Sequence, residues 1–215
     1  MPTTKTERRA FNFEVRAEQN EKHGHFLSGV PIVFGQRTNL GWYDEIIDKS
    51  ALNSTDLKDV RFLIGHDLSM VPLARSRNNN ENSTMQMSVG EEGMRIRVDL
   101  DTENNADSRK LYSAVQRGDI SGMSFAFIVD GDKWDDIDSD HPTRTIRSIK
   151  RVFEVSAVAF PSYEGTTLEE ARSNDAAPDG ARASLESARA AAKQAADAEK
   201  RAAAIQSLQK YRGKA

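Results

Sequence analysis

Hydrophobic and polar residues alternate along the centre of this chain, and a period of two is typical of half-buried β-strands. Alternation over residues 11–15 predicts a first strand, and residues 29–34 continue the pattern after a turn. Residues 85–89 and 94–100 are separated by a turn bounded by glycines, which predicts a β-hairpin. The pattern therefore indicates a mainly β domain.

A helical period replaces the alternation in two places. Residues 107–117 predict the best central helix, with Asp107 or Ser108 as its N-cap and Gly118 as its stop. Residues 184–211 predict a long helix rich in Ala, Lys, Arg, Gln and Glu. Its apolar stripe is too thin to make an independent core. The fold class predicted from the residues is therefore mainly β with flanking helices (α+β), followed by a C-terminal Ala-rich helix.

The changes in composition predict four segments. Residues 1–10 form a flexible leader, and residues 11–170 form one domain, which is long enough to bury a substantial core. Residues 171–183 contain a linker rich in Asn, Asp, Pro and Gly. Residues 184–215 form the helical tail.

Composition excludes several classes of protein. The net charge of -3 is too small and too mixed to favour nucleic acid as a partner, and the absence of cysteine excludes disulfides and thiolate chemistry. No apolar run approaches the ~20 residues that span a bilayer, and the first residues lack the apolar stretch of a secretory signal. The pair His23 and His25 lacks a third ligand, so no metal site is predicted. We expect a cytosolic protein without membrane, metal or nucleic acid.

Three short stretches, residues 63–67, 120–125 and 153–158, each place one reactive side chain in a strand-like apolar pattern. Activation of a serine at neutral pH needs a base within hydrogen-bond reach and a third group that orients the base. A histidine, a serine and a carboxylate supply those parts in a serine hydrolase. The candidates here are His66, Ser124 and Glu154.

The alternation of strand side chains between two faces sharpens this hypothesis. Glu154 lies in an apolar row, where an unpaired charge is costly, so it needs a partner. Ser124 shares its face with the small residues Gly122 and Ala126, which predicts an open surface with room for a substrate backbone. His66 continues the buried row of its own strand.

Structural explanations exist for each residue taken singly. A lone histidine or serine in a strand is more often structural than catalytic, and Arg61 or Arg151 could neutralise Glu154. Asp67 follows His66 directly and points away from it in an extended strand, so Glu154 is the preferred orienting group. The G-x-S-x-G elbow is absent, which removes sequence support for an α/β-hydrolase mechanism.

From about residue 26 to residue 168 the sequence resembles the prohead maturation proteases of tailed bacteriophages, a serine peptidase family similar in fold to the herpesvirus assemblin proteases. The pieces Gly-Met-Ser-Phe and Glu-Val-Ser-x-Val, in this order, are the most specific. The motifs that carry the resemblance are GVPIVFG at 29–35, YDEII at 43–47, GHD at 65–67, GDISGMSFAF at 118–127 and EVSAVAFP at 154–161.

The resemblance implies a role for each candidate. His66 is the base and Ser124 the nucleophile, while Glu154 stands where the herpesvirus relatives use a second histidine. The oxyanion donors follow the third member, which points to the backbone N–H of Ser162 or Tyr163, although the arginine-rich stretch of those relatives is missing here. The implied fold is a bent sheet or closed β-barrel.

The function implied is that of a serine endopeptidase that needs no cofactor. Its substrates are the major capsid protein with its scaffold segment and, by autocleavage, the protease itself, which also suggests a homo-oligomer. The implied location is the host cytoplasm, within the phage procapsid. The rival hypotheses are a non-catalytic scaffolding protein that acts through the C-terminal helix and a broad-specificity esterase that uses the same residues.

Overall fold

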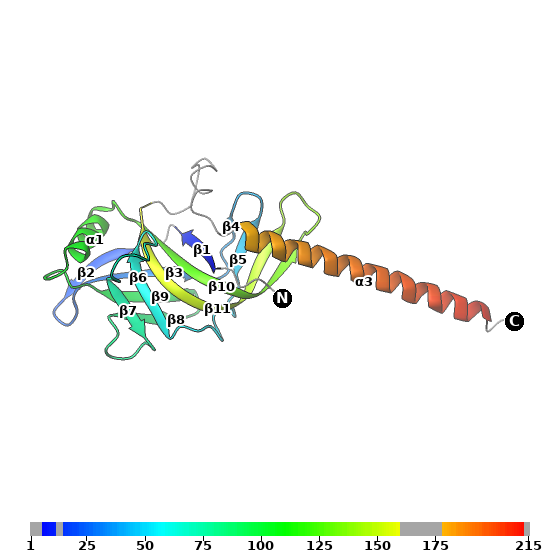
Figure 1. Cartoon of the computed structure of the whole chain (residues 1–215), viewed down its shortest axis with the longest axis horizontal. Helices are drawn as coiled ribbons and strands as arrows, with labels where there is room; N and C mark the ends of the chain where they lie inside the picture. Colours follow the sequence, from blue (N-terminus) through cyan, green and yellow to red (C-terminus); the bar gives the residue numbers. More distant parts are fainter. Residues whose placement is uncertain (1–5, 12–14, 160–177, 213–215) are drawn as a thin grey trace.

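The computed structural model describes residues 6–11, 15–159 and 178–212. Within these ranges the strands form a seven-stranded sheet and a four-stranded sheet (Figure 1). The seven-stranded sheet contains β1 (Thr6–Phe11), β10 (Gly122–Asp135), β11 (Thr143–Val158), β5 (Asp44–Ile47), β4 (Thr38–Asn39), β6 (Asp59–Ile64) and β7 (Ala74–Arg77). The four-stranded sheet contains β2 (Arg16–Asn20), β3 (Gly24–Val33), β9 (Gly93–Asp99) and β8 (Met85–Val89). The predicted hairpin is present as β8 and β9.

The larger sheet bends because its two longest strands are irregular. Bulges interrupt the antiparallel pairing of β10 with β11 between Ala126 and Asp132, and bulges bend strands. One end of β11 pairs in parallel with β5 and the other end with β6. The prediction of a mainly β fold with flanking helices and a C-terminal helix is therefore confirmed. The closed barrel is not, because both described sheets are open.

The core lies between the sheets and is almost wholly aliphatic and aromatic. Its fully buried side chains include Leu27, Phe62, Met94, Phe125 and Ile146. These residues come from both sheets, so each sheet stabilises the other through burial of apolar area.

Helix α1 (Ala106–Arg117) covers β2 and β3 with Leu111 and Val115. The predicted stop is confirmed, because Gly118 has φ 80° in the left-handed region. The cap prediction is wrong by two or three residues, since the side chain of Asn105 accepts the hydrogen bonds at the N-terminus.

Both ends of the described chain differ from the sequence expectations. The sequence predicts a flexible leader over residues 1–10, whereas residues 6–11 form β1 and pair with β10. The long helix α3 (Pro178–Arg212) begins six residues before the predicted start at residue 184. Its first turns pack on the domain, because Ala181 and Leu185 are buried. The thin apolar stripe therefore packs at one end of the helix, in a second hydrophobic cluster with Tyr43 and Trp134.

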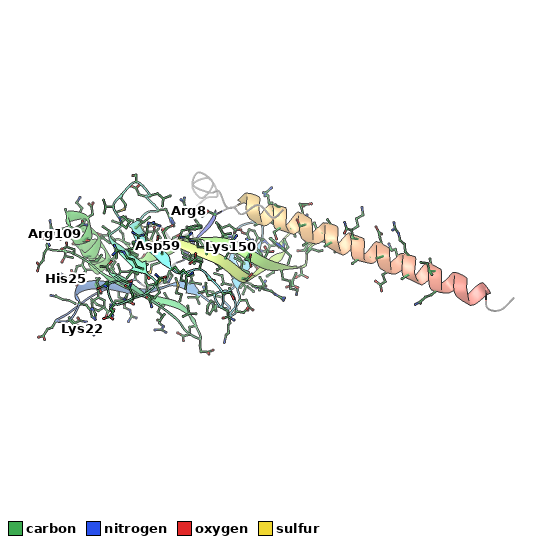
Figure 2. The ribbon with its side chains drawn as sticks, turned by 60° about the horizontal axis from the view of Figure 1, so that its bottom comes forward. Arg8, Lys22, His25, Asp59, Arg109 and Lys150 are labelled. Atoms are coloured by element: carbon green, nitrogen blue, oxygen red, sulfur yellow. The ribbon has the colours of Figure 1, made fainter. Side chains whose placement is uncertain are left out.

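Residues 190–206 of α3 are exposed, and the helix projects from the body (Figure 1). Lys22, His25 and Arg109 lie at the end of the molecule remote from α3, and Arg8 and Lys150 lie nearer to it (Figure 2). No helix in the described ranges combines the length and the apolar character that a bilayer span requires.

Candidate active site

A tight turn after β6 carries His66. The Gly65 N–H extends the parallel pairing of β6 with β11 by donating to the Ala157 carbonyl at 3.0 Å. Gly65 and His66 then have φ angles of 59° and 62°. A left-handed backbone is uncommon at a residue other than glycine and recurs at functional sites. The strand row expected to continue through His66 therefore ends at Ile64, and the turn brings the histidine beside β11.

Glu154 is the partner of this histidine. Its Oε1 lies 2.5 Å from Nδ1 of His66, and the glutamate is only 2% exposed. The carboxylate holds a proton on Nδ1, so Nε2 is the ring nitrogen that can accept a proton from a nucleophile. The structure thus brings together the base and the carboxylate that the sequence singled out.

The other possible partners are engaged elsewhere. Arg61 pairs with Asp59 at 3.2 Å, and Arg151 lies 3.6 Å from Asp56. Asp67 accepts hydrogen bonds from the backbone N–H and hydroxyl of Ser69 instead of reaching His66.

Ser156 belongs to the site, although the sequence analysis did not include it. Its hydroxyl donates to Oε2 of Glu154 at 2.6 Å and accepts from the backbone N–H of His66 at 3.1 Å. The side chain is fully buried. A signal was available, because residues two apart in a strand share a face and Ser156 follows Glu154 by two. Ser156 therefore holds the carboxylate and the histidine turn together.

Ser124 lies directly opposite Ser156 in the pairing of β10 with β11. Side chains at opposite positions share a face with Cβ atoms about 5 Å apart, so Ser124 is one strand away from the group that holds His66. Its hydroxyl donates to the backbone carbonyl of Arg9 in β1 at 2.9 Å, and among the described contacts it makes no hydrogen bond with His66. Ser124 is 1% exposed, so the predicted open surface is wrong for this structure.

A cluster of buried charges anchors β1 beside Ser124. Arg9 donates to the two oxygens of Glu45 at 2.5 and 2.7 Å and to Glu7 at 2.6 Å. Arg144 donates to Glu7 at 2.8 and 3.1 Å and to Glu45 at 3.2 Å. The four residues are between 1% and 4% exposed. Buried charges persist only when they are paired, and this cluster pairs each of them.

The pKa values of the cluster follow from burial and opposite charge. Burial acts to raise the pKa of Glu7, but the charges and hydrogen bonds of Arg9 and Arg144 outweigh it and hold that pKa below its ordinary value. Burial acts to lower the pKa of Arg9, yet the neighbouring Glu45 carboxylate raises it well above its ordinary value. Burial raises the pKa of Tyr43 to about 12, and its hydroxyl accepts a hydrogen bond from Arg9 at 3.2 Å. Glu7 and Arg9 are therefore charged at neutral pH.

The predicted oxyanion donors, Ser162 and Tyr163, lie outside the described residues.

A histidine oriented by a buried carboxylate, with a serine on the neighbouring strand, is the arrangement of a serine hydrolase. The comparison with protein families narrows this class. The model of the caudovirus prohead serine protease family matches residues 11–179, so the chain belongs to that family. It is a serine protease of capsid maturation, and membership implies action on capsid proteins within the phage procapsid.

Among solved structures, the chain is similar to the capsid assembly protease gp21 of bacteriophage T4, with a TM-score of 0.40 and 14% identity over 72% of this chain and 99% of that chain. No curated protein matches the chain.

Proposed function

We propose that His66, Ser124 and Glu154 carry out the peptide hydrolysis. His66 Nε2 takes the proton of Ser124, and Oγ forms a bond to the carbonyl carbon of the substrate peptide. The imidazolium then gives this proton to the amine nitrogen as the C–N bond breaks. Water, activated by the same histidine, hydrolyses the ester and frees the serine. Glu154 orients the ring and stabilises its cationic form.

The observation that carries this proposal is the 2.5 Å contact between the buried Glu154 carboxylate and Nδ1 of His66. A carboxylate on Nδ1 serves the imidazolium that forms when Nε2 takes up a proton. The register supports Ser124 as nucleophile, because it places this serine opposite Ser156 on the same face. Ser156 is the less suitable nucleophile, since its proton is held by Glu154 instead of the imidazole.

The proposed oxyanion donors, domain bounds, substrates and location rest on the family resemblance. The backbone N–H groups of Ser162 and Tyr163 are proposed oxyanion donors, because they follow β11, the strand that carries Glu154. The peptidase domain is proposed to comprise residues 11–170 together with β1, followed by a linker and by the tail that α3 forms from residue 178. The larger sheet is proposed to correspond to that of the assemblin proteases. The substrates are the major capsid protein with its scaffold segment and the protease itself, acting as a homo-oligomer in procapsids in the host cytoplasm.

Co-expression with the major capsid protein of the same phage, followed by intact mass analysis, tests this function. Ser124→Ala should abolish processing, because loss of a triad nucleophile costs on the order of a million-fold in turnover. Ser121→Ala is the matched control, since Ser121 is exposed and precedes β10. Processing by Ser124→Ala, or its loss in Ser121→Ala alone, would show that the nucleophile is misassigned.

A further inference from the structure

Strand β1 has the geometry of a peptide bound at the nucleophile. It pairs antiparallel with β10 as the outermost strand, with Ala10 opposite Ser124 and Arg9 opposite Phe125. The Ser124 hydroxyl, 2.9 Å from the Arg9 carbonyl oxygen, touches the peptide unit between Arg9 and Ala10. Extended peptides commonly bind proteins by adding a strand to a sheet edge in this way.

The side chain of Arg9 enters a site built to receive a cation. Arg9 lies on the face opposite to Ser124, where its guanidinium stacks over the Phe127 ring at 5.6 Å from the centroid. Of the groups outside β1, Glu45 accepts hydrogen bonds from the guanidinium with both oxygens, and the Tyr43 hydroxyl accepts another. Two parallel hydrogen bonds between a planar guanidinium and one carboxylate are specific for arginine. A neutral side chain cannot form this charged, bidentate pair.

The neighbouring side chains of β1 differ in how they are held. Glu7, on the same face as Arg9, is bound by Arg144 through two hydrogen bonds. Arg8, on the face of Ser124, is only half-buried. Deeply buried side chains therefore alternate along β1 with less buried ones. This pattern is expected when a protein binds an extended peptide at a sheet edge and recognises every second side chain.

We propose that β1 occupies the substrate position in cis, and that Glu45 selects peptides with arginine immediately before the cleaved bond. The inference rests on the proposed function, because it takes Ser124 as the nucleophile. A substrate must displace β1 to pair with β10, so the described structure is the closed state of the enzyme. Glu45 is then the specificity-determining residue, and the side chain of Arg9 stands in for that of the substrate.

Peptides with the sequence of residues 4–13 test the register and the specificity on the full-length protein. Mass spectrometry should show cleavage between the second arginine and the alanine. Replacing that arginine with glutamine should lower kcat/KM by about 100-fold, the scale of removing one partner from a buried charge pair. Replacing the first arginine with glutamine is the matched control and should change kcat/KM by less than about 3-fold, since the side chain at that position is not deeply buried. Cleavage at another bond, or equal sensitivity at the two arginines, would overturn the proposal.

Two further measurements distinguish this proposal from the alternative that β1 has a purely structural role. Glu45→Gln should reduce the preference for arginine over glutamine at the cleaved position by at least about 10-fold. In Ser124→Ala, addition of the unmodified peptide should speed hydrogen exchange of the β1 amides and leave the amides of β8 and β9 unchanged. Unaltered exchange in β1 at saturating peptide would show that the strand is permanent. The peptide measurements use the unaltered enzyme, so they remain decisive if Glu45→Gln fails to fold.

The major capsid protein serves as the reference substrate in the same reactions. If the capsid protein is processed but the peptide is not cut after arginine, the inference fails and the proposed function stands. If neither is processed, and Ser124→Ala behaves as the unaltered protein does, the proposed function fails.

Discussion

Replacing Ser156 with alanine should impair catalysis, although this serine is not proposed to touch the substrate. The change removes the hydroxyl that donates to Glu154 at 2.6 Å and accepts from the His66 backbone at 3.1 Å. A hydrogen bond to a charged group contributes about 1.5–3 kcal/mol, and a neutral one contributes about 1 kcal/mol. The free energy of unfolding should therefore fall by about 2.5–4 kcal/mol.

The rate should fall for a geometric reason. His66 has a left-handed backbone with φ 62°, and its N–H group donates to the Ser156 hydroxyl. The variant removes this acceptor and so frees the turn to relax. A displacement of about 1 Å in a catalytic group costs on the order of 100-fold in rate. Turnover of the capsid protein should fall by about that factor, while KM stays unchanged because Ser156 positions other groups and does not bind the peptide.

The assay combines steady-state processing with urea denaturation. Ser148→Ala is the control on the same strand, because the hydroxyl of Ser148 donates to Asp130 over a long 3.4 Å. The free energy of unfolding of this variant should stay within about 0.5 kcal/mol of that of the unaltered protein. Ser156→Thr keeps a hydroxyl and should recover part of the turnover. A folded Ser156→Ala protein with turnover within about 3-fold of the original would refute the positioning role.

Further predictions concern the carboxylates and the buried tyrosine. Glu154→Gln should lower turnover by about 10,000-fold with the fold intact by circular dichroism, as amide replacement does in the serine protease triad; normal turnover here, with a loss in Asp67→Asn, would mean that the orienting carboxylate is misassigned. The folded state lowers the pKa of Glu7 below 4.5, so its contribution to stability is present above that pH and is lost as the pH falls through the folded-state value. In Glu7→Gln the free energy of unfolding should therefore fall less steeply as the pH is lowered into this acid range. Because burial raises the pKa of Tyr43 to about 12, stability should also fall as the pH rises above 10, and less so in Tyr43→Phe.

The sequence predicted the positions of strands better than the pairing of strands that are distant in the chain. Alternation identifies β8 and β9 because a strand with one buried face must alternate, and local glycines mark the turn between them. The pairing of β1 with β10 joins residues more than a hundred positions apart and depends on buried charges at Arg9 and Glu45. Charged residues at the start of a chain ordinarily indicate solvent, so the leader prediction failed where tertiary ion pairs override composition.

In the candidate site, too, the local pattern predicted some features, while others depend on tertiary contacts. Burial of Glu154 in an apolar row correctly indicated that it needs a partner, and the structure supplies His66. The left-handed turn at His66 could not be expected, because non-glycine residues rarely adopt it. The prediction for Ser124 failed for a similar reason. Small neighbours on the same strand face indicate open space beside the serine, but they do not reveal that β1 pairs with the edge of β10 and covers it.

The docking of α3 predicts different consequences for two truncations. Ser184 donates to Asp132 at 2.7 Å, and Asp132 accepts from Arg144 at 2.6 Å, so the first turns of the helix support the charge cluster that anchors β1. A chain that ends at Ala171 loses this bond and the burial of Leu185. Burial of a leucine contributes about 1.5–3 kcal/mol, and the hydrogen bond to a carboxylate contributes a similar amount. The free energy of unfolding should therefore fall by about 3–6 kcal/mol.

A chain that ends at Ala190 keeps the docked turns, and the described residues that it loses, 191–206, are all exposed. Its urea midpoint should therefore match that of the full chain. It should still cleave the capsid protein when the two are mixed at high concentration. If the exposed helix delivers the protease to assembling shells, the same truncation should be depleted from purified procapsids, because a tethered enzyme works at a high local concentration of its substrate. Normal packaging of the chain ending at Ala190 would assign delivery to the domain instead. A loss of stability equal to that of the chain ending at Ala171 would show that the distal turns also pack on the domain.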